Sequence, residues 1–357
     1  HLGGDGHYPD QLGFEENIGG CEAGSPAPGG FFSPWAIPAL KDAPVPEGTY
    51  LTDYLTDKCI ELLETRDSRR PFFLNLWYYS VHTPIEAKEE KIEKYRRKAE
   101  DMGIDSIEPF AVGTAFPCEH KQAERIMRRT IQSDPVYAAM IESLDENVGR
   151  LLDYLDRNDL RENTLVIFTS DNGGLATAEG SPTCNAPLSE GKGWMYEGGT
   201  REPLLVRWPE RIAAGARMEE PVTSTDFYPT ILEAAGLPAD PDQHYDGESF
   251  LPLLEGRNWS RTQPLFWHYP HYGNQGGTPG ASIRRGDWKL IEFFEDEHLE
   301  LYNLREDIGE NRDRSATEPE KRDEMYSALS TWQKEIGALF PQKNTVFTPW
   351  KHWRLTS

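Results

Sequence analysis

Cysteine is scarce in this chain, which has only 4 cysteines among 357 residues. Cys21, Cys59, Cys118 and Cys184 are too scattered to give a metal-site spacing and too few for a dense disulfide framework. They are therefore compatible with either a reducing or an oxidising compartment. Long apolar runs are missing too, since no uninterrupted stretch approaches the length of a membrane-spanning helix.

Positive charge is in deficit, because the chain has 37 Lys and Arg residues but 60 Asp and Glu residues, which gives a net charge of −23. Nucleic-acid binding needs a basic surface that neutralises phosphates, so this composition argues against such a partner. Electrostatic attachment to anionic lipid is disfavoured for the same reason. With 37% hydrophobic residues and 10 Trp, the chain is globular, as one big domain or two unequal ones.

Apolar periodicity divides the chain into an α/β part and a smaller part with a different pattern. Helices are predicted over Thr52–Glu64, from Asp134 to about Arg157, over 226–236 and over Glu318–Ile336. Strands are predicted over Phe72–Trp77, Leu165–Thr169, 203–209, Leu265–His268, Ala281–Arg284, Trp288–Phe294 and Leu299–Tyr302. We therefore expect an α/β domain over 1–256 and an α+β subdomain with an antiparallel sheet over 257–357.

Two further segments have a clear composition. Residues 1–48 are rich in Gly and Pro, which predicts irregular structure. Residues Glu86–Met102 are dense in Lys, Arg and Glu, which predicts a solvated helix with close charge pairs rather than a binding patch.

Polar residues stand where the predicted strands give way to loops. His82 follows the strand 72–77 in the sequence Val-His-Thr-Pro, Asp171 and Asn172 follow the strand 165–169, and Lys192 stands between two glycines. Open α/β sheets bind ligands at the carboxyl ends of their strands. A carboxylate and an amide oxygen suit a hard divalent cation, and the whole set suits such a cation beside a tetrahedral oxyanion.

Each of these residues also has an ordinary structural interpretation. Asn-Gly is a strong turn signal by itself. A single histidine beside an apolar strand is more often packed or exposed than catalytic. A lysine is usually a surface residue, although flanking glycines let the backbone approach a ligand closely.

In this order the motifs resemble those of the sulfatase family, within the alkaline-phosphatase superfamily. The resemblance extends over nearly the whole chain. It implies an alkaline-phosphatase-like sheet flanked by helices, followed by the α+β subdomain. It also implies that Asp171 and Asn172 bind Ca²⁺ (or Mg²⁺) and that His82 and Lys192 act on the sulfate group. Arg201 either belongs to the sulfate site or pairs with an acidic neighbour.

The start of the chain also resembles part of a family motif. His1-Leu-Gly3 is similar to the end of Gly-Lys-Trp-His-Leu-Gly, so the resemblance makes His1 the histidine that lies against the formylglycine nucleophile. No cysteine here is followed by the family's Cys-x-Pro/Ala-x-Arg pattern. We therefore expect that the chain is a fragment, that its formylglycine lies in a missing N-terminal part, and that this segment alone is inactive.

His268 and His271 lie in an aromatic-rich segment of the smaller subdomain and are candidate contacts for the rest of the substrate. The implied reaction is hydrolysis of a sulfate ester, with a sulfated small molecule or carbohydrate as partner, by a metal-assisted formylglycine mechanism. Two alternatives stay open: a phosphate or phosphonate ester hydrolase of the same superfamily, and an inactive fragment. The resemblance also implies a periplasmic or secreted location.

Overall fold

The computed structural model describes residues 3–116, 123–240, 242–243 and 246–342. The chain forms two compact units, which are described separately. The first consists of His1–Pro109 with Gln132–Arg161, and the second of Phe110–Ile131 with Glu162–Ser357. The domain boundary predicted at residue 256 falls within the second unit and stays a prediction.

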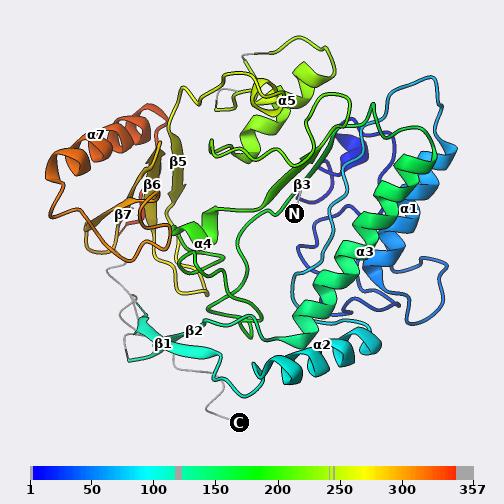
Figure 1. The fold of residues 1–357 in the computed structure, drawn as a ribbon, viewed down its shortest axis with the longest axis horizontal. Helices are drawn as coiled ribbons and strands as arrows, with labels where there is room; N and C mark the ends of the chain where they lie inside the picture. Colours follow the sequence, from blue (N-terminus) through cyan, green and yellow to red (C-terminus); the bar gives the residue numbers. More distant parts are fainter. Residues whose placement is uncertain (1–2, 117–122, 241, 244–245, 343–357) are drawn as a thin grey trace. The chain divides into compact units, whose positions relative to one another are not determined.

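Three helices organise the first unit (Figure 1): α1 (Leu51–Thr65), α2 (Glu89–Met102) and α3 (Pro135–Arg157), with α3 packed against the other two. The predicted start of α3 is confirmed. The Asp134 side chain accepts hydrogen bonds from the backbone N–H groups of Val136 and Tyr137, at 2.9 and 3.0 Å, and Pro135 occupies the first helical position.

The segment before α1 is irregular, as its composition predicts. Among its described residues it has one short 3₁₀ helix, Pro9–Gln11. It is nevertheless well packed, because Phe31, Trp35 and Ile37 are buried in a core that includes Leu51 and Tyr54 of α1. The Gly- and Pro-rich composition predicted the lack of regular helices and strands, but it did not predict that this segment contributes to a hydrophobic core.

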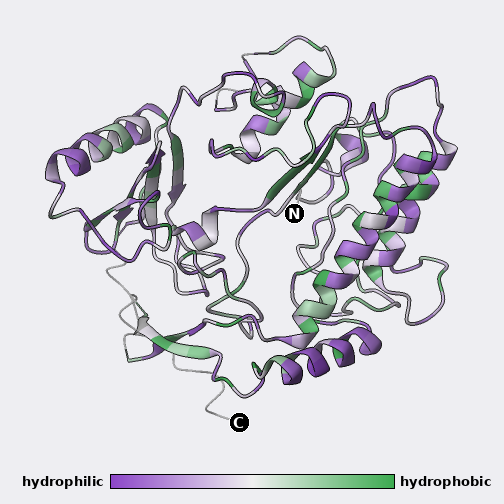
Figure 2. Ribbon diagram, in the orientation of Figure 1, coloured by the Kyte–Doolittle hydropathy of each residue, from purple (hydrophilic) through white to green (hydrophobic). Residues whose placement is uncertain are grey.

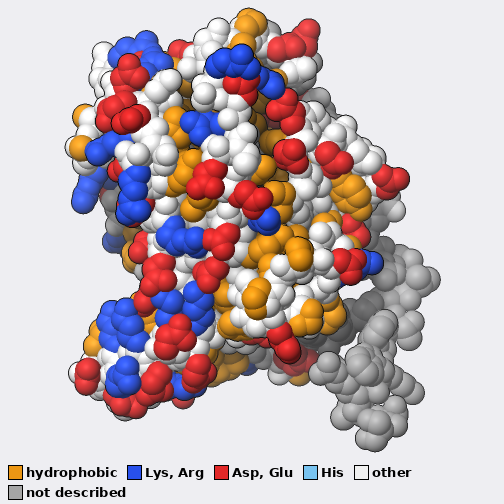
Figure 3. All heavy atoms as spheres, turned by 90° about the vertical axis from the view of Figure 1, so that its right-hand side faces the viewer, with side chains coloured by type: hydrophobic (Ala, Val, Ile, Leu, Met, Phe, Trp, Pro, Cys, Tyr) orange, Lys and Arg blue, Asp and Glu red, His pale blue; other side chains and the backbone are white. Residues whose placement is uncertain are grey.

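The charged segment 86–102 forms α2, which is strongly hydrophilic (Figure 2). Lys91 and Lys94 lie 3.0 and 2.7 Å from the carboxylate oxygens of Glu142 on α3. Hydrogen bonds from Lys94 and Lys91 hold the pKa of Glu142 down at about 2. Basic and acidic side chains are interspersed over the face in Figure 3 rather than gathered by sign, so a solvated, ion-paired helix is confirmed.

The predicted strand Phe72–Trp77 is wrong as a strand. Side-chain exposure does alternate along it, with Phe73 61% and Trp77 53% exposed and the intervening apolar residues partly buried. However, it pairs with no strand among the described residues. A period of two predicts extended backbone, whereas a strand also requires a hydrogen-bonded neighbour.

The second unit begins with two antiparallel strand pairs. One pair is β1 (Phe110–Ala115) with β2 (Arg125–Arg129), which was not predicted from the sequence. The other is β3 (Val166–Thr169) with β4 (Leu204–Arg207), both predicted. The short helix α4 (Glu197–Thr200) lies between β3 and β4, and a 3₁₀ turn (Ser224–Asp226), α5 (Phe227–Ala234) and α6 (Leu251–Leu254) follow β4.

A four-stranded antiparallel sheet completes the second unit, as predicted. Its order is β5 (Leu265–Tyr269), β6 (Gly280–Arg285), β7 (Trp288–Phe293) and β8 (Leu299–Asn303). One face carries Ile283, Leu290 and Leu301 and packs on α7 (Pro319–Glu335), as Figure 1 shows. The other face carries Ile291, Phe293 and Tyr302 and packs on Met195 and Tyr196. Among the described helices, none is long and apolar enough to cross a membrane.

Candidate functional site

The loop after β3 carries the predicted metal ligands. Strand β3 is apolar (Figure 2), and Asp171 and Asn172 follow its end after one residue, Ser170. Asp171 is exposed and Asn172 is partly buried. The hydroxyl of Ser170 donates to the backbone oxygen of Asn172 at 2.9 Å, which fixes the turn.

The loop that carries Lys192 packs directly on this first loop. The Lys192 N–H donates to the backbone oxygen of Gly174 at 3.2 Å. A Cβ atom at Gly191 would lie 2.2 Å from the same oxygen, so only glycine permits this approach. The structure thus brings together the 171–174 and 190–193 segments, which the sequence predicted separately.

Asn185 joins the two loops and was missed at the sequence level. Its amide Nδ2 donates to the backbone oxygens of Gly174 and Glu190, at 2.9 and 2.8 Å, while its Oδ1 accepts from the Gly174 N–H at 3.0 Å. Its neighbourhood, Cys-Asn-Ala-Pro, has no pattern that reveals this role. Its side chain satisfies backbone groups of both loops and therefore fixes their distance.

Glu190, two residues before Lys192, is anchored by the strand pair β1–β2. It has a positive φ of 60°. Its carboxylate accepts a hydrogen bond from Arg128 Nε of β2 at 2.9 Å. Burial raises the pKa of Glu190, and the charge of Arg128 opposes this rise. Lys192 itself is partly buried.

Glu202 adds a second carboxyl group near Asp171. Burial, together with the negative charge of Asp171, raises the pKa of Glu202 to about 7. Its Oε1 atom is buried and has no hydrogen-bond partner among the described residues. A cation held at Asp171 and Asn172 would offset the repulsion between Asp171 and Glu202 and would give the buried Glu202 oxygen a charge partner. The set of oxygen atoms therefore fits a hard ion such as Ca²⁺ or Mg²⁺. No group of three or more His, Cys, Asp and Glu side chains in the described residues is arranged to hold a metal alone.

Arg201 is held by an acidic neighbour. Its Nη1 lies 3.4 Å from Oε2 of Glu197, one helical turn earlier. Glu197 is 1% exposed. This geometry matches the structural alternative for Arg201.

His82 belongs to the first unit, and its ring is fixed by the residue that follows it. Its Nδ1 lies 2.9 Å from the backbone oxygen of Thr83. A carbonyl oxygen only accepts, so Nδ1 carries the hydrogen, which makes Nε2 the atom suited to proton exchange. His1 lies outside the described residues.

His268 lies on the α7 face of the sheet, opposite the face that packs on Met195 and Tyr196. It pairs across the strands with Ala281, which packs against α7. Its Nε2 lies 2.8 Å from the backbone oxygen of Leu339, and its ring contacts Phe294 and Phe340. This placement favours a packing role for His268, whose substrate contact stays a prediction.

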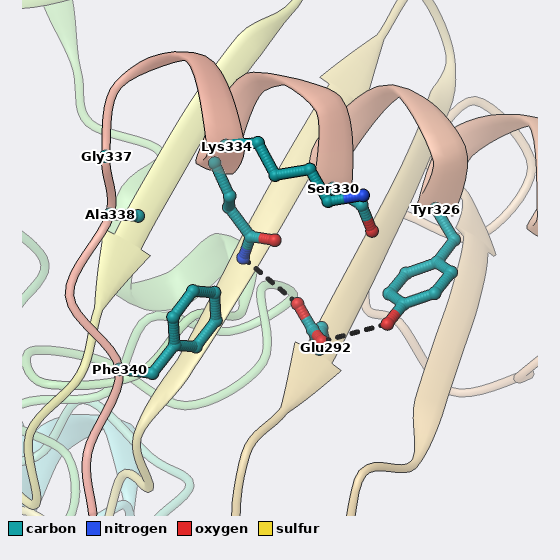
Figure 4. Close-up of a pocket in the computed structure, with 8 residues that line it drawn as sticks. Glu292, Tyr326, Ser330, Lys334, Gly337, Ala338 and Phe340 are labelled. Atoms are coloured by element: carbon teal, nitrogen blue, oxygen red, sulfur yellow. Dashed lines mark hydrogen bonds between the residues drawn. The ribbon is translucent and has the colours of Figure 1, made fainter.

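A cavity of about 510 Å³ is lined by residues of α7, by the segment after it and by Glu292 of β7 (Figure 4). Glu292 accepts hydrogen bonds there from Gln333 Nε2 at 3.1 Å and from the Tyr326 hydroxyl at 3.3 Å. Phe340, which contacts the His268 ring, closes one side. The cavity contains none of the predicted site residues.

His271 is exposed and starts the loop that reaches the Lys192 segment. Within this loop, the backbone oxygen of Gln275 accepts hydrogen bonds from Thr177 Oγ1 at 2.7 Å and from Trp194 Nε1 at 3.2 Å. Trp194 is two residues after Lys192. The loop of His271 is therefore one part of the sheet region that contacts the segment of Lys192, and Gln275 is a contact that the sequence did not reveal.

The α/β fold with its C-terminal four-stranded antiparallel sheet is that of the alkaline-phosphatase-like proteins. Within this class, the chain belongs to the sulfatase family. The family model described as Sulfatase matches residues 3–237. The model described as N-sulphoglucosamine sulphohydrolase, C-terminal, matches residues 190–335.

Named relatives agree with this assignment. A sulfatase from Formosa agariphila is 34% identical over 312 residues, which are 80% of this chain and 51% of that protein. The chain therefore spans about half the length of this relative. An N-acetylglucosamine-6-O-sulfatase from Bacteroides thetaiotaomicron is 32% identical over 220 residues, or 59% of this chain and 37% of that protein.

Among solved structures, the chain is similar to Ps i-CgsB in complex with k-i-k-neocarrahexaose. The TM-score is 0.64 at 28% sequence identity, and the match covers 84% of this chain and 58% of that chain.

Proposed function

We propose that the protein containing this chain is a sulfuric ester hydrolase that acts on a sulfated carbohydrate. The observation that carries the proposal is the packing of the Lys192 loop on the loop of Asp171 and Asn172, through the 3.2 Å hydrogen bond from Lys192 N–H to Gly174 O. This backbone contact places residue Lys192 beside the loop that carries Asp171 and Asn172. Relatives named for a sulfated amino sugar and solved with a neocarrahexaose support the carbohydrate part.

The residues divide the work as follows. Ca²⁺ or Mg²⁺, held by Asp171 and Asn172, would supply positive charge at the sulfate oxygens. Lys192 would donate from Nζ to a sulfate oxygen and stabilise the charge that develops there. His82, with Nδ1–H bound to Thr83 O, would in its imidazolium form give the Nε2 proton to the leaving alcohol oxygen and become neutral. His271 would contact the sugar. A formylglycine nucleophile would come from outside this chain.

The test uses the intact protein with para-nitrophenyl sulfate. We expect metal-dependent release of nitrophenol, and a fall in kcat of about 100- to 1,000-fold in Lys192→Ala, the size found when one oxyanion-stabilising donor is removed. His82→Ala should lower kcat less for this substrate than for an alkyl sulfate, because nitrophenolate leaves without a proton. The matched control is Lys41→Ala, at an exposed lysine, which should keep full activity.

Two results would change the proposal. Faster turnover of para-nitrophenyl phosphate than of the sulfate would favour the phosphate ester hydrolase. Turnover of aryl sulfates without sulfate release from any sulfated oligosaccharide would remove the carbohydrate part.

A further inference from the structure

A buried charge network links the four-stranded sheet to the candidate site. Glu197, the first residue of α4, is 1% exposed, and Lys289 on β7 is fully buried. The Lys289 Nζ atom lies 2.9 Å from Glu197 Oε1 and 3.0 Å from Glu310 Oε1. Arg284 Nη1 on β6 lies 3.5 Å from Glu197 Oε2. All these residues belong to the second unit.

The two carboxyl groups of the network respond differently to burial. Burial disfavours the charged form of Glu197, but the charges of Lys289 and Arg284 outweigh it and hold its pKa below the usual range. Burial raises the pKa of Glu310 to about 7, despite Lys289. Glu310 also accepts a hydrogen bond from the Glu197 N–H at 2.7 Å. The network therefore holds Glu197 as an ionised side chain in one orientation.

The backbone that follows Glu197 contacts both loops of the candidate site. The Gly198 N–H donates to Ser189 O at 2.8 Å, in the segment just before Lys192. A Cβ atom at Gly173 would lie 1.8 Å from the backbone oxygen of Gly198, so α4 packs closely against the loop that carries Asp171 and Asn172. The position of α4 therefore sets the positions of both loops.

The residues before Glu197 are held by the same face of the sheet. The Tyr196 hydroxyl donates to Glu300 Oε2 on β8 at 2.8 Å, and Met195 packs with Ile291 and Phe293. Apolar side chains alone would bury this interface at least as favourably, because buried ion pairs stabilise little relative to hydrophobic residues of similar size. The ion pairs of Glu197 with Lys289 and Arg284 instead fix the orientation of α4 on the sheet.

We propose that Glu197 is a positioning residue, held by Lys289 and Arg284, that fixes Lys192 relative to Asp171 and Asn172. In this proposal the C-terminal sheet holds α4 in place, and α4 in turn holds the two loops that carry Lys192, Asp171 and Asn172. The inference rests on the proposed function for the identity of the anion, but the local effect on the loops is measurable without turnover.

The experiment compares Glu197→Gln with wild type in the intact protein, by amide hydrogen exchange and by calorimetric binding of inorganic sulfate. Exchange at the hydrogen-bonded amides of Lys192 and Gly198 should become at least tenfold faster, while exchange in β6 and β7 stays within twofold. Sulfate affinity should fall several-fold in parallel. If Glu197→Gln does not fold, Arg284→Gln gives the same comparison. It removes the ion pair between Arg284 and Glu197 at a side chain that is less buried than Lys289.

The matched control is Asp226→Asn, because Asp226 is fully buried and pairs with the buried Arg261 in the same unit. Unchanged loop exchange in Glu197→Gln, or equal acceleration in Asp226→Asn, would overturn the positioning role. If Lys192→Ala bound inorganic sulfate as tightly as wild type, the proposed function would be overturned. The hydrogen-exchange result would still decide whether Glu197 positions the loops.

Discussion

Replacing Lys289 with methionine removes the charge of a fully buried ammonium group while keeping most of the side-chain length. Breaking a buried ion pair by removing one partner costs about 3–5 kcal/mol. The pKa of Glu310 is about 7 with Lys289 in place, and removal of this cation raises it further, so Glu310 is mostly neutral in the variant and Glu197 is the carboxylate left without its main partner. Arg284, at 3.5 Å, compensates part of that charge. We therefore expect a loss at the lower end, about 3 kcal/mol.

The measurement is thermal unfolding of the intact protein at pH 7, followed by calorimetry. At about 2–4 °C per kcal/mol for a domain of 150–250 residues, Tm should fall by about 6–12 °C. The control is the triple variant Lys289→Met, Glu197→Gln, Glu310→Gln, which should recover part of the loss because these three side chains then carry no charge and only Arg284, which is less buried, loses its partner. A fall in Tm below about 2 °C, or a triple variant no more stable than the single one, would refute the reasoning.

Variants at other positions test the metal loop, the histidines of the sheet and Glu310. Asp171→Ala should lower the bound Ca²⁺ or Mg²⁺ of the intact protein, and chelation should abolish its turnover; elemental analysis showing unchanged metal would remove Asp171 from the site. His271→Ala should raise KM for a sulfated oligosaccharide but not for a small aryl sulfate, whereas His268→Ala should lower Tm and alter both substrates equally. For Glu310, the pKa of about 7 lies above the usual 4.5, so its contribution to stability is complete below pH 4.5 and is lost as the pH rises through 7. Glu310→Gln should gain up to roughly 3 kcal/mol relative to wild type between pH 5 and 8, measured by urea unfolding, and a pH-independent difference would contradict this.

Local sequence signals predicted the regular elements well where the physics is local. Asp134 followed by Pro135 specifies a helix start because the carboxylate satisfies two orphan N–H groups. The strands after residue 256 were also predicted, since alternating apolar residues suit a sheet with packed faces. The strand 72–77 was not confirmed, because pairing depends on a neighbour that the pattern cannot supply.

The candidate site was only partly accessible from the sequence. Asp171, Asn172 and Lys192 are recognisable as site candidates because their residue types and flanking residues form local patterns. Asn185 is not, because an asparagine that bonds three backbone groups of two loops has no local pattern. His268 and His271 are equivalent candidates in the sequence, but strand register places His268 on the α7 face of the sheet, whereas His271 lies in the loop after β5.

The amino-acid sequence alone indicates the chemistry of the chain, through oxygen ligands after an apolar strand, a lysine between glycines, and family motifs over nearly its whole length. The contacts that hold these segments together become visible only in the folded chain. Lys289 and Glu197 are 92 residues apart in sequence, and their contact depends on the register of the C-terminal sheet. A charge is buried only where folding brings a partner within hydrogen-bond distance, and such long-range pairing is a property of the packed chain rather than of any segment.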